Sequence, residues 1–240
     1  MQKVKDEAGI RTQTTRVKGE SATECATLES LILNSTQISF DCFLSDFTQL
    51  KAVQVINADL VNNLGNLLSR TTVAKINPKQ KYPDAFDLNS LDPELRIVCD
   101  HLTKNLKTLP EKVGKLYDSL LFYKALELIA ETSNLANVFF QHSNAWKKDP
   151  SINLSTTLFL TYESIRLCAL LIQPIVPSYA DRILSRLGIS KNERDLNTAI
   201  FGGESTIKLY GRDLGKDNGV VMERIKLENL DPSIVIMENK

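Results

Sequence analysis

Between about residue 48 and residue 190, the apolar residues of this chain recur every three or four positions, which is the spacing of one face of an α-helix. Proline, glycine and asparagine interrupt the pattern at intervals, where a helix would have to end. Helices with one apolar face bury it best by packing on one another, so the pattern predicts an all-α helix bundle. The expected helices cover residues 50–76, 93–106, 109–142, 155–173 and 178–187.

The ends of the expected helices carry recognisable start and stop residues. Asp92 can cap the second helix, and Pro93 follows at the first helical position. Thr108 and Glu111 have the spacing of a capping box, with Pro110 between them, so a break between the second and third helices is expected there. Asn77 followed by proline is expected to end the first helix.

The two ends of the chain have a different character. Residues 1–46 lack a sustained period and are rich in Thr, Ser, Gln and charged residues, which predicts a weakly ordered segment before a helical domain at 47–190. In the last part, 191–240, the stretches "STIKLYG" and "GVVMERIKL" are separated by a polar segment that ends in Asp-Asn-Gly. This arrangement predicts an extended C-terminal tail or a loose hairpin.

Composition excludes several classes of function. Lys plus Arg (29) equal Asp plus Glu (29), which argues against polybasic binding of DNA and leaves only a local surface for any nucleic acid. The four cysteines are scattered and the two histidines lack ligand spacing, so neither a metal site nor a disulfide framework is expected. The longest apolar run, "LCALLI", is too short to cross a bilayer, and no membrane partner is predicted.

No familiar catalytic motif is present. The sequence has no Gly-rich phosphate loop and no G-x-S-x-G, and we expect no catalytic residue in it. The first 30 residues mix Lys and Arg with several acids, unlike an acid-poor transit peptide, and they contain no signal-peptide core.

The first helix contains an unusual number of amides, in "NADLVNNLGNLLSR" at 57–70. At about 100° per residue the leucines share one side, and the polar residues fall on the other. An ordinary solvated face is the simplest interpretation, but such faces are usually Lys, Glu and Arg, which are better helix formers than Asn. Asn66 and Arg70 are four positions apart and can hydrogen-bond base edges. The residues expected on the polar side are Asp59, Asn62, Asn63, Asn66 and Arg70.

Four stretches, in order, resemble the anticodon-binding domain of methionyl-tRNA synthetases, most closely the mitochondrial type. "NADLVNNLGNLLSR" is similar to the first helix of that domain, and "YKALELI" is similar to its third helix. An asparagine nine residues before a tryptophan (Asn137 and Trp146) matches the loop that follows. "LLIQPIVPSYADRILSRLG" and "GVVMERI" resemble the last helices and the tail. The resemblance covers residues 48–229 and implies a class I synthetase anticodon-binding bundle with a short extended tail.

The resemblance also implies a set of RNA-binding residues. By motif, Asn66 and Arg70 would read bases of the methionine anticodon CAU, and Trp146 would stack on an anticodon base. Amides, arginine and aromatic rings are the groups that recognise unstacked RNA bases. Further RNA contacts would come from Asn63, Asn137 and Lys147. The loop departs from the family pattern where Ala145 replaces a usual proline before the tryptophan.

The parts of a synthetase that use ATP and Mg²⁺ are not matched. Neither a HIGH nor a KMSKS element occurs, so the chain is predicted to need no cofactor and to be inactive alone. The implied partners are the anticodon loop of tRNA(Met) and a catalytic domain supplied by a full-length relative. The resemblance places the chain in the mitochondrial matrix; without a clear transit peptide, the cytoplasm is the other compartment.

Two alternatives stay open. The bundle could be the anticodon domain of another class I synthetase, such as a cysteine or valine enzyme, and exchanging CAU for another anticodon would distinguish them. It could also be a helical protein-interaction module without RNA binding. In that case the apolar stretches "GVVMERIKL" and "SIVIM" would be left without their usual surface.

Overall fold

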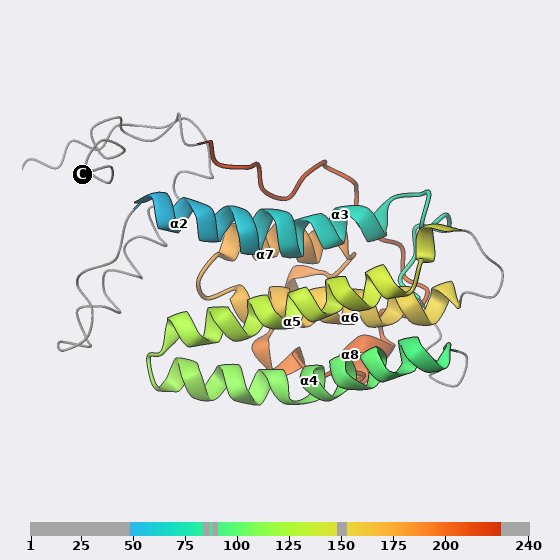
Figure 1. Cartoon of the computed structure of the whole chain (residues 1–240), viewed down its shortest axis with the longest axis horizontal. Coiled ribbons are helices and arrows are strands. Elements are labelled where there is room, and N and C mark those ends of the chain that lie inside the picture. The colour runs from blue at the N-terminus through green and yellow to red at the C-terminus, as the bar shows by residue number, and fades with distance from the viewer. Residues whose placement is uncertain (1–48, 84–86, 88–90, 148–152, 227–240) are drawn as a thin grey trace, which may run out of the picture.

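A computed structural model describes residues 49–83, 87, 91–147 and 153–226. Its first helix is one rod made of three consecutive parts, drawn in blue to teal in Figure 1. The parts are α2 (Gln49–Val55), the π-helix η1 (Ile56–Gly65) and α3 (Asn66–Thr72). The expected helix at 50–76 is therefore present, but it ends at Thr72 rather than at Ile76.

Four further long helices complete the bundle, which confirms the all-α prediction for the described residues. Helix α5 contacts α4, α6 and η1, and α7 packs on α6. Figure 1 shows α4 and α5 side by side, with the first rod on the other side of α5. The helices are α4 (Pro93–Asp118), α5 (Phe122–His142), α6 (Leu154–Ile172) and α7 (Pro177–Arg186).

Helix α6 forms the centre of the core. Among the described residues, it is the one helix long and apolar enough to cross a membrane by length and composition. Every residue from Thr156 to Ile172 is buried against the other helices. Its apolar surface is therefore used inside the bundle, as the core helix of an all-α fold requires.

Helix α4 corrects one predicted boundary. Asp92 caps it as expected, accepting the Glu94 backbone N–H at 2.9 Å. The break expected at Thr108–Glu111 is wrong, because α4 continues through Pro110 to Asp118. The Thr108 hydroxyl donates to carbonyls of the preceding turn instead of capping a new one. The buried stripe of Leu106, Leu109 and Val113 continues across the proline, so packing outweighs the hydrogen bond that proline removes.

The actual break lies between α4 and α5. Ser119 caps α4, and Leu120 adopts a left-handed conformation with φ 58°. Leu121 then donates its backbone N–H back to the Leu116 carbonyl at 2.8 Å. This turn has no proline or glycine, which is why the sequence pattern did not reveal it.

The tail after α7 is more helical than predicted. It contains short 3₁₀ turns, η4 (Lys191–Glu193) and η5 (Leu196–Thr198), and the one-turn helix α8 (Glu204–Ile207). The predicted hairpin between "STIKLYG" and "GVVMERIKL" is wrong over the described residues, because the first stretch is largely helix and turn. The isolated bridge in this part of the structure instead joins Lys81 to Asp213.

The end of the tail runs along the first rod, in the opposite direction, as the dark red trace above α2 and α3 in Figure 1. Asn57 fastens it by two hydrogen bonds: Asn57 Nδ2 donates to the Ile225 carbonyl at 2.8 Å, and the Ile225 N–H donates to Asn57 Oδ1 at 2.9 Å. Val221 and Met222 are buried. The prediction of a weakly ordered segment at 1–46 lies outside the described residues.

Candidate nucleic-acid interface

An open hollow of about 410 Å³ lies where α3, α5 and the 3₁₀ turn η3 (Ala145–Lys147) come together. It is lined by Arg70, Ile76, Phe140, Gln141 and Trp146. Two of the three residues predicted to contact the anticodon, Arg70 and Trp146, therefore share one site although they are far apart in the sequence.

Arg70 is held on two sides within the hollow. Its guanidinium carbon lies 5.2 Å from the centre of the Phe140 ring, the geometry of a cation–π contact. Its Nη2 donates to Gln141 Oε1 at 3.3 Å, in an exposed hydrogen bond. An exposed contact of this length contributes little stability, so the guanidinium can exchange it for a ligand at small cost.

Trp146 is half-buried and held by its neighbour in α5. Its ring and that of Phe140 have centroids 6.1 Å apart and planes at 60°, an edge-to-face arrangement. The turn before it is closed by Asn144 in a left-handed conformation, with φ 50°, and by a hydrogen bond from Lys147 N–H to the Asn144 carbonyl at 2.9 Å. The tryptophan is thus oriented by backbone and ring contacts while part of its surface stays accessible.

Asn66 is exposed and begins α3, one helical turn before Arg70. It is not one of the residues that line the hollow. Its side chain makes no hydrogen bond with another residue of the described part of the chain, and its backbone N–H bonds the Val61 and Asn63 carbonyls. The amide is therefore available to a ligand that extends from the hollow along the helix.

Asn63 and Asn137 lie together; Asn63 is buried in the bundle and Asn137 is half-buried. Asn63 is only 7% exposed, and its Oδ1 accepts from Ser133 Oγ at 2.9 Å and from Asn137 Nδ2 at 2.7 Å. Its Nδ2 donates to the Ala130 carbonyl at 3.1 Å. The expectation that Asn63 shares an exposed polar face is wrong. Both amides join η1 to α5. Contact of Asn63 with RNA would require breaking these hydrogen bonds.

The π-helical geometry explains why the helical-wheel prediction is wrong at this position. In η1 the backbone bonds run from residue i to i+5, so each residue turns the helix less than in an α-helix. Residues placed on one face by a step of about 100° then separate. The Leu60 carbonyl in η1 accepts a hydrogen bond from the Tyr179 hydroxyl at 2.7 Å. The same carbonyl lies so close to Gly65 that a Cβ added at Gly65 would be 2.8 Å from it.

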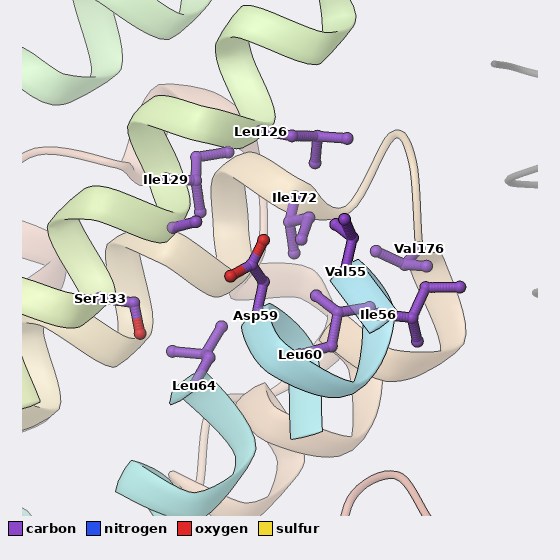
Figure 2. A pocket seen from close by; sticks show the side chains of 11 residues that line it. Val55, Ile56, Asp59, Leu60, Leu64, Leu126, Ile129, Ser133, Ile172 and Val176 are labelled. Atoms are coloured by element: carbon purple, nitrogen blue, oxygen red, sulfur yellow. The ribbon is translucent and has the colours of Figure 1, made fainter. Parts of the chain in front are cut away.

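Asp59 also departs from the expected polar face. It lines a second, apolar pocket of about 60 Å³ between η1, α5 and the junction of α6 with α7. Figure 2 shows its carboxylate pointing toward Ile129 and Ile172, and no residue of this pocket lines the hollow that contains Arg70. Desolvation in this pocket raises the pKa of Asp59 above its usual value. Asp59 therefore belongs to the core side of the rod.

Lys147 is exposed next to Trp146, as a residue at the edge of the hollow. Phe140, Gln141 and Ile76 complete the lining and were not predicted from the sequence. For Phe140 and Gln141, the one sequence feature that could have indicated them is their place between the two matched residues Asn137 and Trp146. Across the described residues, no group of His, Cys, Asp and Glu side chains could hold a metal ion.

Comparison with known proteins finds methionine–tRNA ligases from several organisms. No protein-family model matches the chain. The mitochondrial methionine–tRNA ligase of Bos taurus is 34% identical over 206 residues, covering 78% of this chain and 34% of that protein. The human mitochondrial enzyme is 33% identical over 204 residues, and the methionine–tRNA ligase of a Nostoc species is 31% identical over 151.

Solved structures agree with the sequence matches. Apo methionyl-tRNA synthetase of Mycobacterium tuberculosis superposes with a TM-score of 0.63 at 26% identity, covering 75% of this chain and 35% of that one. The fold is thus a helix bundle of the class I aminoacyl-tRNA synthetase type. Within that class, the chain is homologous to methionyl-tRNA synthetases. It spans about a third of the length of the relatives it matches.

Proposed function

We propose that this chain binds the anticodon loop of methionine tRNA, reading CAU as the RNA-binding part of a methionine–tRNA ligase. The observation that carries the proposal is the meeting of Arg70 and Trp146 in one open hollow. Their roles follow from their chemistry, since Arg offers a fan of donors to base edges and Trp offers a stacking surface. Asn66, one turn away and exposed, supplies a donor and an acceptor for a neighbouring base.

The proposal extends to the partners of the chain. Activation of methionine with ATP and Mg²⁺ would be carried out by a separate catalytic domain. The relatives named above from cattle and humans are mitochondrial enzymes, which supports the mitochondrial matrix as the compartment. Asn137 and Lys147 stay secondary candidates for RNA contact, with Lys147 favoured by its exposure.

The test is a binding titration of purified protein against an RNA hairpin with CAU in its loop and one with a permuted loop. We expect tighter binding of the CAU hairpin, and a smaller difference between the two hairpins in Arg70→Lys and Asn66→Ala variants. Arg70→Lys keeps the charge but loses the planar fork of donors, so it tests base reading separately from charge. Equal binding of both hairpins by the wild type would falsify CAU recognition.

The interaction-module alternative has less support. It depended on apolar tail stretches without a surface, but Val221 and Met222 of "GVVMERI" are buried in the fold. The stretch "SIVIM" lies outside the described residues. Preference for another anticodon in the titration would favour a different class I synthetase.

A further inference from the structure

Both walls of the hollow lack acidic residues, although the chain as a whole has no net charge. No Asp or Glu occurs from Asn66 to Pro83 or from Thr132 to Lys147. The first stretch carries four cations and the second carries one, together with a histidine. Positive charge is therefore concentrated beside the hollow and balanced elsewhere. The cations are Arg70, Lys75, Lys79, Lys81 and Lys147.

Three of these lysines are exposed next to residues that line the hollow. Lys75 directly precedes Ile76, and Lys147 directly follows Trp146. Lys79 is exposed in the next turn, three residues after Ile76. Lys81 is different, because its ammonium lies 3.5 Å from an Asp213 carboxylate oxygen and donates to the Gly211 carbonyl. Lys81 therefore fastens the tail, and the other three lysines make no such contact within the described structure.

The segment after α3 that carries Lys75 and Lys79 is held by several internal hydrogen bonds. Gln80 Nε2 donates to the Thr72 and Asn77 carbonyls, both at 2.8 Å. Its Oε1 accepts from the buried Arg186 at 2.9 Å, and Arg186 also donates to the Thr72 carbonyl at 2.7 Å. The backbone from α3 to Gln80 is thus fixed relative to the hollow. The side chains of Lys75 and Lys79 therefore extend from fixed points beside it.

We propose that Lys75, Lys79 and Lys147 form a cationic rim that neutralises backbone phosphates of single-stranded RNA on both sides of the bases in the hollow. The inference rests on the proposed function and assigns the phosphate contacts that it leaves open. Phosphate neutralisation releases counterions and strengthens binding without regard to sequence. The rim therefore supplies affinity, Trp146 adds a stacking surface, and Arg70 and Asn66 supply selectivity. A chain of zero net charge can in this way bind RNA through a local field.

The experiment measures the salt dependence of hairpin binding for the wild type, for Lys75→Gln/Lys79→Gln/Lys147→Gln and for a matched control. The control, Lys104→Gln/Lys107→Gln/Lys112→Gln, removes the same charge from exposed positions of α4. For each rim lysine removed, the slope of log K against log[salt] should become shallower by about 0.7–0.9. The rim variant should weaken CAU and permuted hairpins by the same factor, and the control should behave as the wild type does.

The outcomes separate this inference from the proposed function. A rim variant with the wild-type slope, or a control variant that loses as much slope, overturns the rim. A rim variant that loses the CAU preference also overturns it, because the lysines would then read bases. If the wild type shows no CAU preference but the rim variant still has a shallower slope than the control, the rim stands and anticodon recognition fails. Circular dichroism melting should be unchanged in both variants, since the altered side chains are exposed.

Discussion

The last two parts of the first rod, the π-helix η1 and the α-helix α3, carry the same type of side chain and use it differently. In η1, Asn57 and Asn63 are 5% and 7% exposed, and their amides bond the tail and α5. In α3, Asn66 is exposed and Arg70 lines the hollow. An amide on a helix therefore indicates a binding surface only when the local helix geometry turns it outward.

The change of geometry occurs at Gly65, directly before Asn66. A Cβ at this position would meet the Leu60 carbonyl at 2.8 Å and Val221 Cγ2 at 3.3 Å. The glycine allows the rod to pack closely on the tail while the helix changes from π to α. The polar side chains after it then keep ordinary α-helical spacing, which is why Asn66 and Arg70 stay one turn apart.

The largest effect is expected from Asn63→Ala. The substitution leaves the Ala130 carbonyl, Ser133 and Asn137 without hydrogen bonds that Asn63 now supplies. Loss of buried partners of this kind costs about 2–4 kcal/mol in the free energy of unfolding. Urea denaturation measures it, with Asn66→Ala as the matched control, expected within about 0.5 kcal/mol of wild type. Equal losses in the two variants would remove the distinction between η1 and α3.

A smaller effect is expected from Trp146→Ala, and on binding rather than on selectivity. Removing a stacking surface should weaken the CAU hairpin by about 1–3 kcal/mol, roughly a 5- to 150-fold rise in Kd. Trp146→Phe keeps an aromatic face and should retain most of the affinity. Because the ring also packs on Phe140, the unfolding free energy is measured in parallel. Binding by the alanine variant at the wild-type Kd would show that the tryptophan is a packing residue only.

The smallest effect is expected from Asp59→Asn in the apolar pocket. Burial raises the pKa of Asp59, so the folded state binds its proton more strongly than the unfolded state does. The ionised carboxylate therefore lowers stability, and this cost grows as pH rises from below 3.8 through the raised pKa. The neutral variant should be more stable than the wild type at pH 7, and the difference should vanish at pH 3.

The measurement is the difference in unfolding free energy between the Asp59→Asn variant and the wild type from pH 3 to pH 7. Taking a difference cancels other carboxylates such as Glu193, whose pKa Arg212 lowers to about 2 and whose stabilisation is lost as pH falls from 4.5 toward 2. A variant less stable than the wild type at pH 7 would mean that the ionised Asp59 carboxylate stabilises the folded state. RNA binding should not change, since this pocket and the hollow share no residue.

Much of the fold could be predicted from local sequence patterns, and the predictions that were wrong have a common cause. The cap at Asp92 and the extents of α6 and α7 follow from residues close in sequence. The continuation of α4 through Pro110 does not, because packing of Leu106, Leu109 and Val113 against other helices decides it. The same holds for α8 and for the course of the tail. Of the candidate site, Arg70 and Trp146 were predicted, whereas Phe140 and Gln141 become visible only when α3 and α5 are placed together.

The sequence by itself determined that the chain forms amphipathic helices, because apolar spacing, caps and prolines act within a few residues. It also determined which residue types are available to RNA, since donors and aromatic rings are properties of single side chains. Only the tertiary structure decided which amides face inward. Asn63 is buried because α5 presents the Ala130 carbonyl, Ser133 and Asn137 to it, and these groups lie some seventy positions away. Burial depends on what the rest of the chain places opposite a side chain, and no local pattern contains that information.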